Sequence, residues 1–513
     1  MSKSILKTFF TYIINDIIEN KKSHIFLLIF LAVVFCSFKF ILAHDDLMYY
    51  YGVVILYSDF YYRFIYENRI FYPLIVYIIN SLYLSPKIIL LFGFILFYIN
   101  NFILIKLFFP KITKISYIFL SLLLAVNPLN FYTIRWSTTF FGIQLAIFVL
   151  FFSYYLFTQT NLKLYLKLFI SSLAIWFSLS LMPVIFYIYI TVLFLSVFWK
   201  FLLSNELNLK KIIKDNYLHI SYILLGIAIF YIVDKLLLFY FHGTHNYSGR
   251  GEYYPVDSFN LLFFRINNTF LVLKQVLPIH FYSIIILNVL FLSYNIYTKK
   301  TYILPITFFV FICVLLFIPF TTDILLDVGG TLVRFNSLHY IMAVLFMLAI
   351  NIFNKYFVKV ILFVLSIYIL MSVGLIDRYS KILADQFRIN TSIYDNIQLE
   401  STKFDVNGNT KIYIYGRLPS YLFGLTEKRD IALLRIFGYY PDIGDWSKFY
   451  YQLPFLLKHI GYSNVEHLFN DNIDKELRNI IDDKTLKGII YPKEGSIFEY
   501  KGNIYVIFSK DNN

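Results

Sequence analysis

Residues 24–46 read HIFLLIFLAVVFCSFKFILAHDD, a long apolar segment that ends in a charged triplet. Residues 24–43 are nearly uncharged, and about twenty such residues are enough to cross a hydrocarbon core of roughly 30 Å. An ionised aspartate at the centre of a membrane helix costs about 2.5–3.5 kcal/mol. The triplet His44-Asp45-Asp46 therefore marks the point where this span ends.

The composition places the chain among integral membrane proteins. It is 59% hydrophobic and only 15% charged, with a mean hydropathy of +0.67, whereas soluble chains carry roughly 25% charged residues. The net charge of +14 comes from lysines spread over short loops, which argues against a nucleic-acid partner. Cys36 and Cys313 lie in apolar stretches, so we expect no disulfide framework and no cysteine-rich metal site.

The N-terminal segment has the pattern of an amphipathic surface helix. Asp16 and Glu19 interrupt its apolar stretch and no small-residue cleavage site follows, which is unlike a cleavable signal peptide. Lys21 and Lys22 then directly precede the first span. We expect this helix to lie on the membrane surface.

Further apolar segments predict a polytopic α-helical membrane protein with about eleven spans. Pro73 and the short length of residues 70–85 favour a re-entrant or interfacial helix for that segment. The predicted spans are 24–43, 87–108, 115–127, 137–158, 168–182, 183–203, 217–240, 281–298, 301–320, 336–352 and 357–375.

The loops between these spans alternate in charge. One set is rich in lysine, and the other holds the carboxylates together with most of the arginines. By the positive-inside rule the lysine-rich loops are cytoplasmic, which puts the N-terminus inside and both His44-Asp45-Asp46 and the C-terminus outside. The lysines are Lys21, Lys22, Lys111, Lys114, Lys163, Lys167, Lys210, Lys211, Lys214, Lys299, Lys300, Lys355 and Lys359.

The composition changes near residue 376. We expect a multi-span domain over residues 1–375, with a catalytic outward loop at 44–86, and a small exported α/β or α+β domain over 376–513. Neither an internal repeat nor a glycine-rich phosphate loop is recognisable. Strands are predicted at 411–416, 488–492 and 503–509, and helices at 377–399, 445–461 and 471–483.

The first outward loop concentrates groups suited to proton transfer. Asp45, Asp46 and Asp59 lie near the membrane with Arg63 and Arg69. A carboxylate can remove the proton of an acceptor hydroxyl, and two adjacent carboxylates either raise one pKa by repulsion or bind a divalent cation together. The alternative is a solvated helix end whose charges serve topology only.

A second polar concentration lies in the outward loop 241–257. His242, His245 and Glu252 have the residue types of a zinc site, but the glycine-rich spacing offers no helix to present both imidazoles, so we expect no metal there. A sugar-binding loop using Arg250 and Tyr253-Tyr254 is one alternative, and a plain connecting loop is the other.

The order of these features along the chain resembles that of a known family of membrane enzymes. An outward Asp45-Asp46 pair after the first span, then many spans and an exported domain, resembles the GT-C class of polyprenyl-phosphate-sugar-dependent glycosyltransferases. More narrowly, it is similar to the O-antigen glucosyltransferases of serotype-converting phages and bacteria. Their basic motif in the same loop corresponds to Glu67-Asn68-Arg69, without its glycine. The stretches NPLNFYTIRW (127–136) and YPKEGSIFEYKGNIYVIFS (491–509) also look similar to that family.

The resemblance implies transfer of a hexose, often glucose, from undecaprenyl phosphate to a lipid-linked or surface glycan such as the O-antigen of lipopolysaccharide. The reaction would occur at the outer face of the bacterial cytoplasmic membrane. Asp45 or Asp46 is then the base, and Arg135 and Arg334 are candidates to hold the donor phosphate. The other substrate-binding candidates are His44, Asp59, Arg63, Arg69, Arg250 and His339.

Each of these assignments has a simpler alternative. Arg135 and Arg334 also fit interfacial arginines that extend to the headgroups, and His339 also fits a hydrogen-bonded residue of the helix core. For the whole chain, the alternative is a lipid-linked glycan polymerase or a flippase. Charged residues inside the spans are few (Lys39, Lys106, Asp234 and Lys235), which favours chemistry at the surface over translocation.

Overall fold

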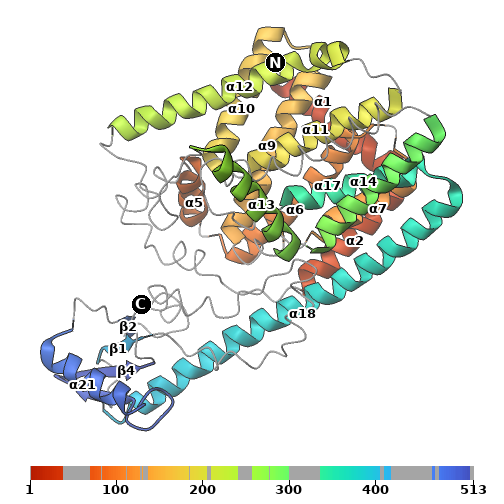
Figure 1. Ribbon diagram of the computed structural model, residues 1–513. Helices are drawn as coiled ribbons and strands as arrows, with labels where there is room; N and C mark the ends of the chain where they lie inside the picture. The colour runs from red at the N-terminus through yellow and green to blue at the C-terminus, as the bar shows by residue number, and fades with distance from the viewer. Residues whose placement is uncertain are drawn as a thin grey trace. The chain divides into compact units, whose positions relative to one another are not determined.

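The computed structural model shows a mainly helical protein with a small sheet (Figure 1). Among the described residues, those up to Ile376 pack into one compact unit and those from Asp377 onward into a second. The structure describes residues 2–37, 70–82, 84–110, 112–127, 130, 137–183, 185–204, 209–240, 257–276, 278–299, 336–404, 410–416, 465–467 and 473–508.

The first unit consists of helices. Five of them contain segments long and apolar enough to cross a membrane: 87–108, 139–159, 164–181, 217–237 and 355–381. Several long apolar helices of this kind indicate a membrane-embedded protein. The helices are α1 (Ser2–Glu19), α2 (Lys21–Ser37), α5 (Phe71–Ser81), α6 (Pro86–Phe108), α7 (Lys114–Ala125), α9 (Ser137–Gln159), α10 (Leu164–Leu181), α11 (Ile185–Ser204), α12 (Leu209–Tyr240), α13 (Phe259–Val276), α14 (Pro278–Lys299), α17 (Asn336–Ile352) and the part of α18 (Lys355–Ser401) up to Ile376.

The predicted spans compare closely with these helices. The segments 87–108, 137–158, 168–182, 217–240 and 357–375 each overlap one of the five long apolar stretches over most of its length. Shorter apolar helices occupy 114–125, 185–197, 278–291 and 337–352. The first predicted span is helical as far as Ser37, its last described residue, and the predicted span 301–320 lies outside the described residues. Helix α13 was not predicted, because Arg265, Asn267 and Asn268 interrupt its apolar pattern.

Polar contacts join the lysine-bearing ends of several helices. The Trp199 indole of α11 donates to the Pro110 carbonyl between α6 and α7, at 2.9 Å. The Thr113 amide before α7 donates to the Asn351 side chain near the end of α17. Lys167 of α10 donates to the Phe157 carbonyl near the end of α9. The loop ends that sequence assigns to one side of the membrane therefore meet at one end of this unit, which we call the lysine end.

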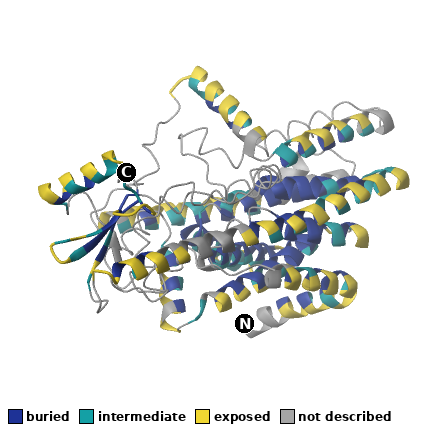
Figure 2. Ribbon diagram, turned by 90° about the horizontal axis from the view of Figure 1, so that it is seen from below, coloured by how far each residue is buried: buried dark blue, intermediate teal, exposed yellow. Residues whose placement is uncertain are grey.

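Small and hydroxyl-bearing residues let the interior helices approach closely. Ser172 of α10 donates to the Tyr222 carbonyl of α12 at 3.1 Å, and Ser171 donates to the Ser153 carbonyl of α9 at 3.3 Å. A Cβ at Gly226 would lie 2.6 Å from the Ile175 Cβ, so only glycine fits this crossing. Close backbone approach of this type is the usual way in which membrane helices associate. Figure 2 shows buried residues on the interior helices and exposed ones along the outer faces.

The second unit contains a four-stranded sheet in the order β2-β1-β4-β3. Strand β1 (Ile412–Tyr415) pairs in parallel with β2 (Val465–His467) and β4 (Asn503–Ile507), and β3 (Ile497–Tyr500) pairs antiparallel with β4. Helix α21 (Lys475–Leu486) packs on the sheet. Alternating apolar residues of the strands and one face of α21 form the core: Tyr415, Leu477, Ile481, Tyr505 and Ile507.

Four predictions for this region are confirmed and one is wrong. The predicted strands at 411–416 and 503–509 correspond to β1 and β4, and the predicted helices at 377–399 and 471–483 correspond to the last part of α18 and to α21. The predicted strand at 488–492 forms turns instead, because Gly488 adopts a left-handed φ of 66° and Pro492 has no amide hydrogen to donate. The strand that pairs with β4 is β3, at 497–500. The predicted helix 445–461 lies outside the described residues.

Candidate functional site

Of the residues predicted to form the site, His339 is the one that the structure describes. It lies in α17, and its side chain is fully buried. The remaining predicted residues lie outside the described part of the chain: His44, Asp45, Asp46, Asp59, Arg63, Arg69, Arg135, Arg250 and Arg334, together with His242, His245 and Glu252 of the second outward loop.

His339 belongs to a chain of hydrogen bonds between three helices. Its Nε2 lies 2.6 Å from the Leu123 carbonyl oxygen of α7, and its Nδ1 lies 2.8 Å from Nε2 of His280 in α14. Both imidazole side chains are fully buried. His280 was not among the predicted site residues, since nothing in its local sequence distinguishes it from other isolated residues in an apolar helix.

The order of the donors follows from the carbonyl at one end of this chain. The Leu123 carbonyl only accepts, so Nε2 of His339 carries the hydrogen, and in the neutral ring Nδ1 of His339 is the acceptor. His280 must then donate from Nε2, which leaves its own Nδ1 as a lone-pair acceptor. That nitrogen is buried and has no hydrogen-bond partner among the residues that the structure describes. The chain of hydrogen bonds therefore ends at Nδ1 of His280, and we call it the open chain.

The histidine pair lies at the end of the unit opposite to the lysine end. Helices α14 and α17 run parallel, because His280 meets His339 near their first residues and Tyr294 meets the Ile352 carbonyl near their last. Leu123 is close to the end of α7, a helix that begins at the lysine end. Side chains that sequence places on the outward side are therefore buried together here.

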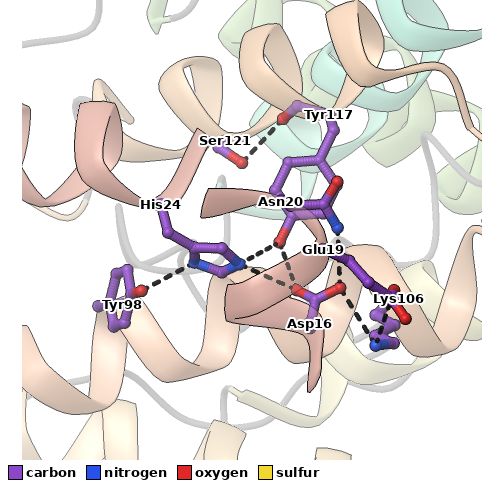
Figure 3. A network of polar contacts seen from close by, with 8 residues as sticks. All are labelled: Asp16, Glu19, Asn20, His24, Tyr98, Lys106, Tyr117 and Ser121. Carbon is purple, nitrogen blue, oxygen red and sulfur yellow. Dashed lines mark hydrogen bonds and ion pairs between the residues drawn. The ribbon is translucent and has the colours of Figure 1, made fainter. Parts of the chain in front are cut away.

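A second polar cluster, which we call the Asp16 network, lies at the lysine end (Figure 3). The Asp16 carboxylate of α1 accepts a hydrogen bond from Nε2 of His24 at 3.0 Å and from the Tyr117 hydroxyl at 2.8 Å. The Asn20 amide donates to its other oxygen at 3.0 Å, and Lys106 forms an ion pair with the same oxygen at 3.3 Å. Asp16 and His24 are each only 2% exposed.

The partners of Asp16 control its protonation. Burial raises the pKa of Asp16, but the hydrogen bonds from His24 and Tyr117 and the charge of Lys106 outweigh burial, so the pKa lies below its ordinary value. Lys106 also ion-pairs with Glu19 at 3.7 Å and lies over the Tyr12 ring at 4.6 Å. The carboxylate is therefore ionised and has four side-chain donors around it.

Neither of the two clusters forms a metal site. Within the described ranges, no group of three or more histidine, cysteine, aspartate or glutamate side chains is arranged to hold one. Asp45 and Asp46, for which the sequence suggests a divalent cation, lie outside these ranges.

Searches of family models, of curated proteins and of solved structures find no match to this chain. The fold by itself defines a helical protein with several helices able to cross a membrane.

Proposed function

We propose that this protein is a membrane glycosyltransferase that moves a hexose from a polyprenyl-phosphate carrier to a lipid-linked or surface glycan. Glucose is the sugar we favour, and the outer face of a bacterial cytoplasmic membrane is the proposed location. The observation that carries the proposal is the Asp45-Asp46 pair directly after the first span, on the side of the membrane that lacks the lysines.

The direction of α2 supports this assignment. His24, near the start of α2, lies in the Asp16 network at the lysine end. Helix α2 then leads away from that end, and Asp45 follows eight residues after its last described residue, Ser37. The direction of α2 therefore supports a location of the proposed catalytic pair on the side opposite to the lysine end, where His280 and His339 are buried.

The proposed chemistry needs a base and a stabilised leaving group. Asp45 or Asp46 would remove the proton from the acceptor hydroxyl as that oxygen attacks the anomeric carbon of the sugar. The leaving group is the polyprenyl phosphate, whose negative charge Arg135 or Arg334 would stabilise through paired hydrogen bonds. His44, Asp59, Arg63, Arg69 and Arg250 are proposed to bind the two substrates.

The experiment is a transfer assay with purified protein in liposomes. Radiolabelled polyprenyl-phosphate glucose is supplied with a lipid-linked glycan from the source organism, and label in the glycan is measured. We expect Asp45→Asn or Asp46→Asn to lower the rate at least 100-fold at equal protein level, in line with the loss of a general base. Asp377→Asn is the matched control, because the Asp377 side chain is 46% exposed and forms a surface ion pair with Lys381.

Wild-type rates in both aspartate variants would contradict the proposal. Label that crosses the bilayer without joining the glycan would instead indicate a flippase, and longer glycan chains without added hexose would indicate a polymerase.

A further inference from the structure

We infer that α1 is a three-sided interfacial helix, whose exposed apolar flank contacts the lipid surface while the Asp16 network fixes it to the spanning helices. This inference does not depend on the proposed glycosyl transfer.

The side chains of α1 divide into three sectors around its axis. Phe9, Ile13 and Asp16 are buried, with exposed fractions of 2%, 8% and 2%. The next sector is apolar and exposed: Phe10 is 56%, Ile14 53% and Ile18 69% exposed. The third sector is polar and exposed, and it consists of Thr8, Thr11, Asn15 and Glu19.

The order of these sectors matches a helix lying at a bilayer surface beside a protein. Successive residues are about 100° apart, so the apolar sector lies between the buried and polar sectors. If water contacted both free sides of α1, the three large apolar side chains on one side would form an exposed apolar patch, which is unfavourable in water. Protein, lipid and water as the three neighbours account for all three sectors.

The contacts of α1 show that it crosses several helix ends. The Phe9 ring packs on Phe152 and Tyr155 of α9, with centroid distances of 4.9 and 4.8 Å. Seven residues later, about 10 Å along the helix, Asp16 contacts Tyr117 of α7 and Lys106 of α6. Helix α1 therefore runs across the lysine end from α9 to α7, which is the direction expected of a helix in the membrane plane.

The residues that follow α1 support lipid as the occupant. Only Asn20 separates α1 from α2, and α2 continues the exposed apolar surface through Ile25, Phe26 and Ile29, which are 46–59% exposed. These three belong to the first predicted span, which sequence places in lipid. Lys21 and Lys22, at the junction, are exposed and can reach headgroup phosphates.

The Asp16 network gives this surface helix a fixed position. An interfacial helix usually binds through its apolar face alone, but Asp16 ties α1 to three other helices through His24, Tyr117 and Lys106. The charge is buried and fully surrounded by donors, so a sliding or rolling movement of α1 would leave it without partners.

The test is a nitroxide scan in nanodiscs of phosphatidylethanolamine and phosphatidylglycerol, in a chain with Cys36 and Cys313 replaced by serine. Single labels are placed at Phe10, Ile14 and Ile18, and at Thr11, Asn15 and Glu19. Collision rates are measured with oxygen, which concentrates in lipid, and with a water-soluble nickel chelate. Leu370 of α18 (72% exposed) is the lipid control, and Glu476 of α21 (71% side-chain exposed) the water control.

We expect the ratio of oxygen to nickel collisions at the apolar flank to approach that of Leu370 and to exceed the ratio at the polar flank at least fivefold. A water-like ratio at Phe10, Ile14 and Ile18 would overturn the inference. Low collision rates with both reagents would also overturn it, since protein, such as a second copy of the chain, would then cover the flank.

The fixing role is tested with Asp16→Asn, which keeps the shape of the side chain and removes its charge. A label at Asn15, on the exposed polar sector, should become more mobile in the variant than in the parent chain. Unchanged mobility would show that the apolar contacts of Phe9 and Ile13 hold α1 without the network.

Discussion

The two ends of the helical unit bury polar groups in opposite ways. At the lysine end, the Asp16 carboxylate is charged, and four side-chain donors surround it, three from α2, α6 and α7 and one from Asn20 between α1 and α2. At the other end, His280 and His339 form a chain of hydrogen bonds that starts at a backbone carbonyl and stops at a ring nitrogen with no partner in the described part of the protein.

This difference distinguishes a closed network from an open one. A buried charge is tolerated only when its donors are complete, so the Asp16 network has the properties of a structural joint. An unpartnered nitrogen in a buried position costs stability and persists where something else requires the residue. The open chain lies at the end opposite to the lysine end, and the positive-inside rule predicts the proposed catalytic aspartates on that side as well.

The largest expected effect comes from opening the closed network. Asp16→Ala removes the carboxylate and leaves Lys106, His24 and Tyr117 without their shared acceptor. We expect a loss of about 3 kcal/mol, seen as a lower Tm in thermal unfolding of the detergent-solubilised protein. Asp377→Ala, which removes an exposed pair with Lys381, should change stability by less than about 0.5 kcal/mol. Equal shifts in the two variants would mean that the Asp16 network is not closed in solution.

The open chain predicts an asymmetry between its two histidines. His339 bridges the Leu123 carbonyl and His280, whereas within the described ranges His280 makes one side-chain hydrogen bond and its Nδ1 has no partner. His339→Leu should therefore destabilise the protein by about 1 kcal/mol more than His280→Leu does. The Tm values of the two purified variants decide the point, and the reverse order would show that Nδ1 of His280 has a partner in solution.

Removing a single peripheral bond of the closed network should have a smaller effect. Tyr98 shares one hydrogen bond of 2.8 Å with Nδ1 of His24. Tyr98→Phe keeps the ring packed on Phe102 and loses that bond, so we expect a cost of about 1 kcal/mol by the same Tm measurement. A loss as large as that of Asp16→Ala would place the centre of the network at His24 rather than Asp16.

The smallest effect is a pH dependence at the closed end. The pKa of Asp16 is lowered in the folded protein, so its contribution to stability is full above the unfolded value, about 4, and is lost as the pH falls through the folded pKa. The Tm difference between wild type and Asp16→Asn should therefore shrink when the pH is lowered from 6 to 3. A difference that stays constant would mean that Asp16 does not titrate in this range.

Sequence predicts the helices of this protein well and its clusters poorly. Apolar length located the five long membrane segments, and an interrupted apolar stretch at Asp16 indicated an amphipathic helix. The Asp16 network joins residues up to 101 positions apart, so no local pattern reveals it. His280 and His339 are 59 residues apart, and each alone looks like any histidine in an apolar helix. The strand error at 488–492 arose because β-branched residues outweighed Gly488 and Pro492 in the interpretation.

The position of β1 has a consequence for the order in which the second unit folds. Both neighbours of β1 come later in the chain, and β4 occupies the place between β1 and β3. Ile412 must therefore wait until the segment ending at Ile507 has been synthesised before its pairing on that side can form. Until then the edge of β1 that faces β4 stays unpaired, and an unpaired strand edge is the kind of surface that aggregates during folding.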